Sequence, residues 1–453
     1  MSVRLVCPPR ARRHLFLLWV IVLATASALL ASDRFNPIPR QVFTGPEAGP
    51  WERVELLEDT HPAFTQETFA PPTRWQDPWI RRWFGTDTPS SGLVLLHCAK
   101  GYQGRTFRHP VLLVHGAGDN ANRAWIHPFH AVLPDDPLPP EKQGFAPWLA
   151  NLGYAVFAVT FAHNQGDNFR QAEQVANAIR RIRILLGRTH DPTFAVDVVA
   201  HSKGNVAVRL YCSDGAALFP QKRFLTPFRG DVRTYIAIAP PMRGIDTPFR
   251  SYAYNLAVAT KGTYNAPVAP DAMLLNGQWQ SMDARSLFPD KGGNPFPGQC
   301  QLLYNLVRDA GVRLGADSAT PFDHNLTRDA LYHGGRSTVL HGRGIDAAIA
   351  AGEHLIYRLE AQGLDPRVRL AVLAGTKRYI TWYVDGLGYI PLPAELAAPA
   401  GDGVVFLASA CHLDGILRRH APLLGMKTLD LNHLGLTCHR DAFAAIDEWL
   451  IAP

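Results

Sequence analysis

One segment of the chain combines the residue types that a nucleophilic serine requires. An apolar run over residues 196–200 is followed by His-Ser-Lys-Gly at residues 201–204. A nucleophilic serine stands at the apex of a strained turn from strand to helix, where only small residues fit two positions before and after it. Ala200 and Gly204 satisfy that requirement. The pattern predicts that Ser202 is a nucleophile, and an ordinary serine at a helix N-cap is the alternative interpretation.

A second segment carries the backbone that the same reaction needs around its developing negative charge. The apolar run at residues 110–114 ends in His-Gly-Ala-Gly at residues 115–118. Glycines allow such a loop to place backbone N–H groups close to a reacting oxygen. The two segments, in this order, predict an oxyanion hole formed by the amides of Ala117 and Lys203. The Lys203 side chain has no part in that role, and we expect it to be solvated at a helix start.

With these residues in view, the chain resembles the α/β-hydrolase superfamily, and within it the secreted bacterial lipases that carry Ala-His-Ser-x-Gly. The resemblance extends from about Gly92 to the C-terminus. It departs at Asn205, where many relatives have a second glycine, and this leaves the packing of the helix behind the serine open. The resemblance implies that the catalytic acid and base follow the serine, in the order Ser, Asp, His.

The resemblance also assigns the acid and the base. Asp402, in Ala-Gly-Asp-Gly-Val-Val, resembles the Asn-Asp-Gly-Leu-Val segment that holds the acid in these lipases, while Asp385 is the competing candidate. His433, in Leu-Asn-His-Leu, resembles the Met-Asn-His-Leu segment that holds the base. A plain Gly-Asp-Gly turn is the alternative for Asp402. Three further histidines fit surface positions, namely His412, His420 and His439.

The elements that must hold these residues alternate between strand and helix patterns. From residue 92 to residue 239, short apolar runs alternate with amphipathic segments, which is typical of a mostly parallel sheet covered by helices on both faces. The predicted fold class is α/β, an α/β-hydrolase domain over residues 92–453. A long glycine- and proline-containing stretch, about residues 249–362, interrupts the pattern and predicts a cap or lid. Within it, bulky residues alternate over residues 252–258, as in a half-buried strand or an acyl-chain groove.

The N-terminal part of the chain divides into a leader and an extension. Residues 1–31 have basic residues, an apolar stretch and small-residue cleavage sites, which predicts a signal peptide and a secreted or periplasmic protein. An uncleaved membrane anchor is the alternative. Residues 32–91 predict an irregular extension, in which Trp79 and Trp83 share one face of a short helix. That face could contact lipid or pack on the domain.

Charge and cysteines exclude several function classes. The formal charge of the 453-residue chain is +6, and it falls to about +2 once a leader with four arginines and no acidic residue is removed. No basic run remains, so the sequence gives no reason to expect a nucleic-acid partner. The cysteine spacings fit no zinc site, and we expect neither a metal nor a cofactor. With Asp402 and His433 assigned through the resemblance, a Cys411–Cys438 disulfide would join the acid loop to the base loop.

Together these features predict a secreted serine hydrolase that cleaves carboxylic esters through a Ser202–Asp402–His433 triad and an acyl-enzyme. The leader, the cap and the lipase-like motifs favour acylglycerol esters as substrates, with contact to a lipid interface. A polyester depolymerase and an acyltransferase remain alternatives on the same skeleton. A catalytically silent binding protein of the same fold is the alternative from another class.

Overall fold

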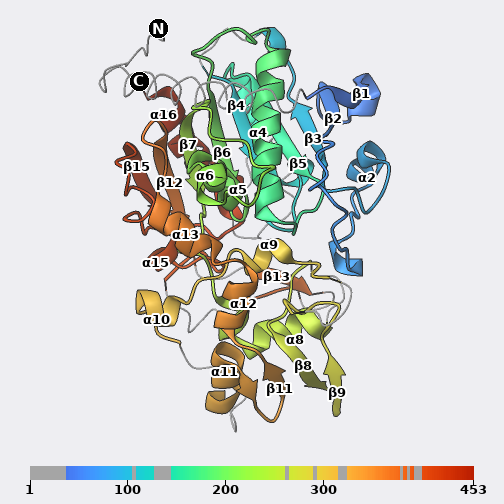
Figure 1. The fold of residues 1–453 in the computed structure, drawn as a ribbon, viewed down its shortest axis with the longest axis vertical. Helices are drawn as coiled ribbons and strands as arrows, with labels where there is room; N and C mark the ends of the chain where they lie inside the picture. Colours follow the sequence, from blue (N-terminus) through green and yellow to red (C-terminus); the bar gives the residue numbers. More distant parts are fainter. Residues whose placement is uncertain are drawn as a thin grey trace, which may run out of the picture.

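The nine-stranded sheet at the centre of the molecule fixes where the candidate residues lie. The computed structural model describes residues 37–104, 109–126, 144–260, 265–288, 293–314, 324–377, 381–384, 388–391 and 400–452 of the chain. The leader proposed for residues 1–31 and Asp385 therefore lie outside the described residues. Figure 1 shows the sheet with helices packed against it and a group of smaller elements gathered at one end.

The sheet is parallel over most of its width. Its order is β1-β2-β3-β5-β4-β6-β7-β12-β15, parallel from β5 to β15 and antiparallel from β1 to β5. The strands, in chain order, are β1 (Pro39–Thr44), β2 (Arg53–Glu58), β3 (Leu93–Cys98), β4 (Val111–Val114), β5 (Val156–Phe161), β6 (Val196–His201), β7 (Val232–Ile238), β12 (Arg369–Gly375) and β15 (Leu423–Leu429). This arrangement confirms the predicted α/β-hydrolase fold class.

Helices cover both faces of the sheet, which explains why its central strands are continuous apolar runs rather than alternating ones. Every residue of β4 and β6 is buried. Helices α4 (Asn168–Leu185) and α5 (Gly204–Cys212) contribute to the core on one face. Helices α3 (Phe145–Asn151) and α16 (Arg440–Ile451) contribute to the core on the other.

The N-terminal extension is more regular than the sequence predicted. Strands β1 and β2 lie within the stretch expected to be irregular, and they extend the sheet beyond β3. The sequence pattern of β2 is hidden by Glu55, a fully buried carboxylate that binds the guanidinium groups of Arg53 at 2.7 Å and Arg181 at 2.6 Å. A buried acid inside a strand breaks the apolar run by which such strands are recognised.

The short helix expected in the extension is present as α2 (Pro78–Phe84). Asp77 caps it by accepting hydrogen bonds from the amides of Trp79 and Ile80. The Trp83 side chain is buried against the sheet and donates its indole N–H to the carbonyl of Glu47 at 2.8 Å. Packing against the domain therefore accounts for this tryptophan.

A cap, defined here as residues 247–362, is inserted between β7 and β12. Its small antiparallel sheet has the order β10-β11-β8-β9. The cap elements are α7 (Thr247–Arg250), α8 (Tyr252–Thr260), β8 (Pro270–Leu275), β9 (Gln278–Ser281), α9 (Pro297–Cys300), α10 (Leu306–Ala310), α11 (His324–His333), β10 (Gly335–Arg336), β11 (Leu340–Gly342), α12 (Ile345–Ala351) and α13 (Leu355–Gln362). The cap thus occupies the interval in which an insertion was predicted.

Residues 252–258 form a helix, α8, and not the predicted strand. Their bulky side chains alternate, but the buried positions are Tyr252, Asn255 and Val258, which follow the helical spacing. Asn255 is accommodated on the buried face because its side-chain amide donates to the carbonyls of Pro248 (2.6 Å) and Ser251 (2.7 Å). A polar residue on the buried face is invisible to a pattern based on apolar residues alone.

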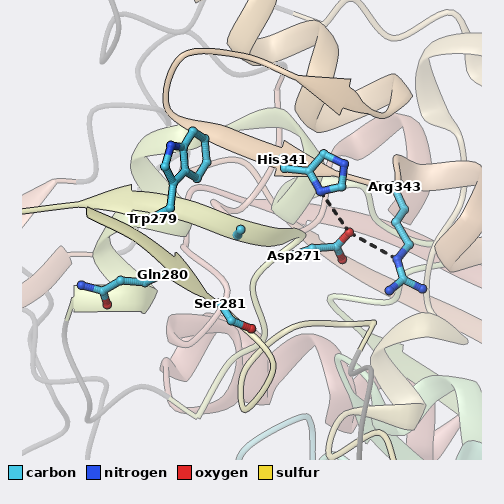
Figure 2. Close-up of a pocket in the computed structure, with 7 residues that line it drawn as sticks. Asp271, Trp279, Gln280, Ser281, His341 and Arg343 are labelled. Atoms are coloured by element: carbon cyan, nitrogen blue, oxygen red, sulfur yellow. Dashed lines mark hydrogen bonds and ion pairs between the residues drawn. The ribbon is translucent and has the colours of Figure 1, made fainter. Parts of the chain in front are cut away.

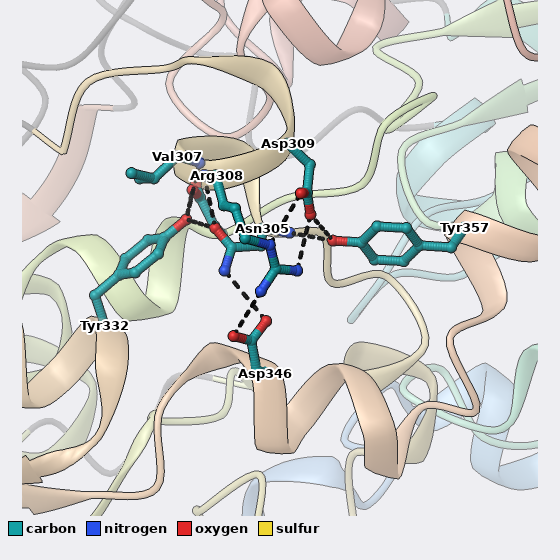
Figure 3. Close-up of polar contacts among 8 residues, drawn as sticks. Asn305, Val307, Arg308, Asp309, Tyr332, Asp346 and Tyr357 are labelled. Atoms are coloured by element: carbon teal, nitrogen blue, oxygen red, sulfur yellow. Dashed lines mark hydrogen bonds and ion pairs between the residues drawn. The ribbon is translucent and has the colours of Figure 1, made fainter.

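Polar side chains supplement the apolar core in joining the helices of the cap. The Arg308 guanidinium binds the carboxylates of Asp309 at 2.9 Å and Asp346 at 2.8 Å (Figure 3). The hydroxyl of Tyr357 donates to Asp309 at 2.6 Å, and that of Tyr332 accepts from the amide of Val307 at 3.2 Å (Figure 3). These contacts connect α10 to α11, α12 and α13.

The remaining elements are short. They are helices α6 (Gly215–Leu218) and α15 (Leu407–Ala410), the hairpin β13 (Thr381–Val384) and β14 (Gly388–Pro391), and brief 3₁₀ or π turns at Gly45–Ala48, Pro71–Thr73, Tyr102–Gly104, Asn122–Ile126 and Gly435–Thr437. Among the described residues, no helix combines the length and the hydropathy that crossing a membrane requires.

Candidate active site

Ser202 stands on a strained turn between β6 and α5. Its φ angle is 51°, in the left-handed region that non-glycine residues rarely adopt. Gly204 explains the need for a small residue in this turn, since a Cβ built there would lie 2.4 Å from the carbonyl oxygen of His115. The amide of Ser202 donates to the carbonyl of Ile238 in β7 at 3.0 Å. The strained turn is therefore tied to the neighbouring strand.

His433, in the loop after β15, lies between Ser202 and Asp402. Its Nε2 is 2.8 Å from Ser202 Oγ, and its Nδ1 is 2.9 Å from Asp402 Oδ2. A carboxylate only accepts hydrogen bonds, so Nδ1 carries the proton and Nε2 is left to accept the serine hydroxyl proton. All three predicted triad residues are thus brought together in one hydrogen-bonded line.

The carboxylate of Asp402 is buried and fixed. Its Oδ1 accepts hydrogen bonds from the amides of Val404 (3.0 Å) and Val405 (2.8 Å), while its backbone carbonyl accepts from the amide of His433 at 2.9 Å. A Cβ built on Gly375, at the end of β12, would lie 2.8 Å from Asp402 Cβ. The acid loop is therefore packed directly on the end of the strand that precedes it in the sheet.

The amides of Ala117 and Lys203 lie on the two loops that flank Ser202. Neither N–H donates to an acceptor among the described residues. The loop before Ala117 approaches the serine closely, because a Cβ on Gly116 would lie 2.9 Å from Ser202 Cβ. Two unused N–H groups beside a nucleophile are suited to bind a developing oxyanion.

His115 shapes this loop. Its Nε2 accepts from the amide of Phe161 at 3.3 Å, so its Nδ1 carries the proton and donates to the carbonyl of Gly116 at 2.8 Å. Burial lowers the pKa of His115 to about 4, which keeps the ring neutral near pH 7. Arg123 adds a second support by donating to the carbonyl of Gly118 at 2.8 Å.

Residues 108–253, which include the serine turn and the loop of Ala117, match the family model described as "Lipase (class 2)". The chain is a lipase-like α/β-hydrolase. It is an enzyme of the carboxylic ester hydrolase class. No curated protein matches the hydrolase at a significant level.

Several solved structures are similar to the hydrolase at low sequence identity. The mature form of the Bacillus licheniformis lipase BlEst2 is 14% identical, over 76% of this chain and 92% of that one, with a TM-score of 0.37. Esterase B from Lactobacillus rhamnosis is 12% identical, over 97% and 94%, with a TM-score of 0.37. The monoacylglycerol lipase of Paleococcus ferrophilus is 12% identical, over 76% and 96%, with a TM-score of 0.31.

The Lys203 side chain of the hydrolase differs from the prediction. It is 2% exposed and not solvated, and its Nζ lies 2.5 Å from Gln171 Oε1 in α4. Burial lowers the pKa of Lys203 to about 7, while the nearby carboxylates of Glu67 and Asp167 oppose that shift. The prediction failed because α4 and the cap, which are distant in sequence, close over a position that looks like an exposed helix start.

His201, which the sequence analysis did not single out, contacts the candidate base. Its Nε2 donates to the carbonyl of His433 at 3.0 Å, and the two rings lie 4.8 Å apart. Burial lowers the pKa of His201 to about 3. Its place between a buried strand and Ser202 was the signal that could have identified it.

Asn205 explains how the hydrolase tolerates the absence of a second glycine. The Asn205 amide donates to the carbonyls of Ser202 (2.9 Å) and Ile238 (3.0 Å), and its Oδ1 accepts from the hydroxyl of Tyr235 at 2.8 Å. The side chain thus braces the serine turn from behind.

The other histidines considered in the sequence serve elsewhere. His439 caps α16 by accepting from the amide of Asp441 at 3.2 Å. His412 lies 3.4 Å from the carboxylate of Glu360, and His420 occupies a left-handed turn with a φ angle of 61°. His433 is the histidine that reaches Ser202 in the described part of the chain.

The predicted disulfide between Cys411 and Cys438 is not formed among the described residues. The Cys438 thiol contacts the carbonyls of Leu434 at 3.6 Å and Gly435 at 3.4 Å within its own turn. The hydrogen bonds of Asp402 and His433 join the two loops instead. In the described part of the hydrolase, no cluster of three or more histidine, cysteine or acidic side chains could hold a metal ion.

A separate recess of about 400 Å³ lies on the cap sheet of the hydrolase. Figure 2 shows Trp279 and Gln280 on β9, with Asp271 binding His341 and Arg343 across the recess. Its lining is Asp271, Ala272, Trp279, Gln280, Ser281, His341 and Arg343. None of the triad residues contributes to it, so this recess is distinct from the candidate active site.

Proposed function

We propose that the hydrolase cleaves carboxylic esters by a covalent serine mechanism, with acylglycerols as its substrate class. The observation that carries the proposal is the line of hydrogen bonds from Ser202 through His433 to Asp402. The class 2 lipase match supports lipid esters over other esters. The separation of Ser202 Oγ from His433 Nε2, 2.8 Å, is within direct proton-transfer distance.

In this mechanism His433 Nε2 takes the proton of Ser202 as Oγ attacks the ester carbonyl. Asp402 keeps the proton on Nδ1 and stabilises the imidazolium that forms. The carbonyl oxygen becomes an oxyanion and accepts hydrogen bonds from the amides of Ala117 and Lys203, each donor of this kind contributing about 3–4 kcal/mol. His433 then protonates the departing alcohol, and water hydrolyses the acyl-enzyme by the same steps in reverse.

The test is hydrolysis of p-nitrophenyl esters across acyl lengths, and of an emulsified triacylglycerol, by the hydrolase and its Ser202→Ala variant. Activity that increases toward long acyl chains, extends to the emulsion and disappears in the variant is the expected result. A short-chain preference without action on the emulsion would indicate an esterase. Ester formation with an added alcohol in place of hydrolysis would indicate an acyltransferase, and turnover by neither protein would contradict the proposal.

We also propose that residues 1–31 direct export, because they have the basic and apolar pattern of a signal peptide. The mass of the exported protein distinguishes cleavage from a retained anchor.

We propose further that the cap contacts a lipid interface, because Trp279 and Leu326 are 54% and 65% exposed on it. Flotation with phosphatidylcholine vesicles, reduced by Trp279→Ser and Leu326→Ser, tests the contact, and unchanged flotation would contradict it.

A further inference from the structure

Lys203 directly follows the candidate nucleophile in the sequence, and its side-chain amino group is buried. The mechanism proposed above uses only the backbone N–H of Lys203, whereas the side chain extends to α4 and ends 2.5 Å from Gln171 Oε1. A buried amino group is costly unless polar groups surround it. The side chain of Lys203 makes no capping hydrogen bond to α5, so its burial beside the serine turn has another structural basis.

The acceptor of that hydrogen bond is itself fixed. Gln171 donates its amide Nε2 to the carbonyl of His163 at 2.7 Å. His163, at the end of β5, is 2% exposed, and its Nε2 lies 3.0 Å from the carbonyl of Thr68. Lys203 is thus bound to a side chain whose amide group is itself hydrogen-bonded to the backbone at His163.

The cap packs directly over the lysine. A Cβ built on Gly298, in α9, would lie 2.3 Å from Lys203 Cε and 2.1 Å from the carbonyl oxygen of Gly166. The amide of Gly298 donates to the carbonyl of Gln165 at 3.1 Å, and its carbonyl accepts from Asn168 Nδ2 at 3.0 Å. This part of the cap lies close enough to Lys203 that only glycine fits.

Further hydrogen bonds join the cap to the loop between β5 and α4. Gln299 donates to Gln165 Oε1 at 2.6 Å, and Gln301 Oε1 accepts from the backbone and side-chain amides of Asn168 at 2.7 and 2.9 Å. We call these four side chains, Gln165, Asn168, Gln299 and Gln301, the amide tie. The amide tie fixes α9 above Lys203.

The loop between β5 and α4 also contacts the segment that contains Ala117, the second candidate donor to the oxyanion. Gln165 donates to the carbonyl of Asn265, at the other end of the cap, at 2.6 Å. Asn265 donates to Asn164 Oδ1 at 3.1 Å, and the carbonyl of Asn164 accepts from the amide of Gly118 at 3.4 Å. Both loops that carry the oxyanion amides are therefore linked to the cap.

We propose that the Lys203 side chain is a positioning residue for ester cleavage: its bond to Gln171, enclosed by α9, sets the orientation of the peptide whose N–H binds the oxyanion. The inference rests on the proposed function. It assigns to the cap a part in the catalytic geometry in addition to any part in substrate binding. Loss of the side-chain amino group leaves the backbone N–H of residue 203 present but turned away from the oxyanion.

The test compares Lys203→Met, which fills similar space without donors, with wild type on a soluble short-chain ester. The expected result is a fall in kcat of about 10- to 100-fold with KM within about twofold, since a misaligned donor costs less than the complete loss of one. Lys222→Met is the matched control, because Lys222 pairs with Glu353 of the cap at 2.5 Å and has no contact with the serine turn. Its kcat is expected to stay within about twofold of wild type.

A thionoester series separates positioning from general damage. Sulfur accepts N–H hydrogen bonds poorly, so an intact oxyanion hole favours oxoesters over thionoesters. In Lys203→Met the ratio of oxoester to thionoester rates is expected to fall several-fold, whereas a smaller active fraction would lower both rates equally. An unchanged ratio, or an unchanged kcat, would overturn the inference.

Two further variants keep the test decisive if Lys203→Met does not fold. Gln171→Met removes the acceptor, and Gly298→Ala forces α9 away from the lysine; each is expected to lower the same ratio. Normal ratios in both would equally overturn the inference. Failure of the proposed function has a different signature, because wild type itself would then hydrolyse no ester or Ser202→Ala would remain active.

Discussion

The sheet region and the cap share one apolar cluster but differ in the polar contacts that supplement it. In β4 and β6 every side chain is buried, and the helices on both faces add apolar surface. In the cap, charged and hydroxyl side chains connect the helices, as Arg308 does with Asp309 and Asp346. Apolar burial fixes the strands beside the candidate triad, whereas the cap adds charged and hydroxyl contacts to an apolar cluster that it shares with the sheet. Changes in the two regions should therefore have different effects.

The largest effect on activity is expected from replacing Asp402, the candidate catalytic acid. Asp402→Asn leaves the side-chain volume nearly unchanged but no longer holds the proton on His433 Nδ1, so kcat should fall about 10⁴-fold. Steady-state kinetics on a soluble ester measures it. Asp430→Asn, on an exposed carboxylate in the base loop, is the control and should retain activity. Asp385→Asn tests the other candidate of the sequence, and a loss there with an active Asp402→Asn would reverse the assignment.

A smaller loss is expected from crowding the serine. A methyl group at Gly116 would lie 2.9 Å from Ser202 Cβ and 3.1 Å from His201 Nδ1. Gly116→Ala should therefore displace the loop of Ala117 and lower kcat about 10²-fold, as for the loss of one oxyanion donor. Gly104→Ala, where nothing lies within 4 Å of the added methyl group, should be neutral. Equal kinetics for the two variants would show that the loop tolerates displacement.

Acid should destabilise the sheet region through four buried histidines. Burial lowers the pKa of His97, His163 and His201 to about 3 and that of His115 to about 4. Unfolded histidine titrates near pH 6.5, so below that pH the unfolded state binds more protons and the free energy of unfolding decreases as the pH falls toward the folded values. Each histidine contributes up to about 1.4 kcal/mol per pH unit.

Urea unfolding between pH 7 and pH 4.5 measures this dependence. In His97→Gln the free energy of unfolding should depend less steeply on pH, because one of the four titrating histidines is removed. The variant itself should be less stable at pH 7. A slope identical to that of wild type would mean that His97 is protonated in the folded protein or that it does not titrate in this range.

The smallest effect is expected from a cap hydroxyl that makes no contact with the amide tie. The hydroxyl of Tyr332 donates to the buried Asp246 at 2.8 Å, so Tyr332→Phe should cost about 1–3 kcal/mol and lower Tm by a few degrees. Its kcat on a soluble ester should remain within about twofold. Tyr254→Phe, in α8, removes a hydroxyl that forms no hydrogen bond with the described residues and should leave Tm unchanged. A large loss of kcat in Tyr332→Phe would break the distinction between the two regions.

The same distinction explains how much the sequence could predict. Ser202 follows an apolar run that is recognisable without a structure, and the alternation of such runs predicts the fold class. Asp402 and His433 were assigned through the resemblance of their segments to lipase motifs. The strand β2 was missed because Glu55 is buried inside it, and the helix α8 was not recognised because Asn255 on its buried face is polar. Both errors come from buried polar residues, which a pattern based on apolar residues alone does not reveal.

Lys203 shows the same limit within the candidate site. Its neighbours in sequence indicate an exposed helix start, while Gln171 and Gly298, which enclose it, lie in other parts of the chain. Contacts of this kind depend on the folded arrangement of three segments. The candidate nucleophile could be proposed from local pattern, whereas the contacts that hold its surroundings could not.

The most direct test of the central claim, that Ser202 is the nucleophile, is intact-mass spectrometry after treatment with a fluorophosphonate. Such reagents modify a serine only where a neighbouring base activates it. The account predicts one adduct per chain, located at Ser202 by peptide mapping, and none in Ser202→Ala. An adduct on another residue, or an unmodified wild-type protein, would contradict it.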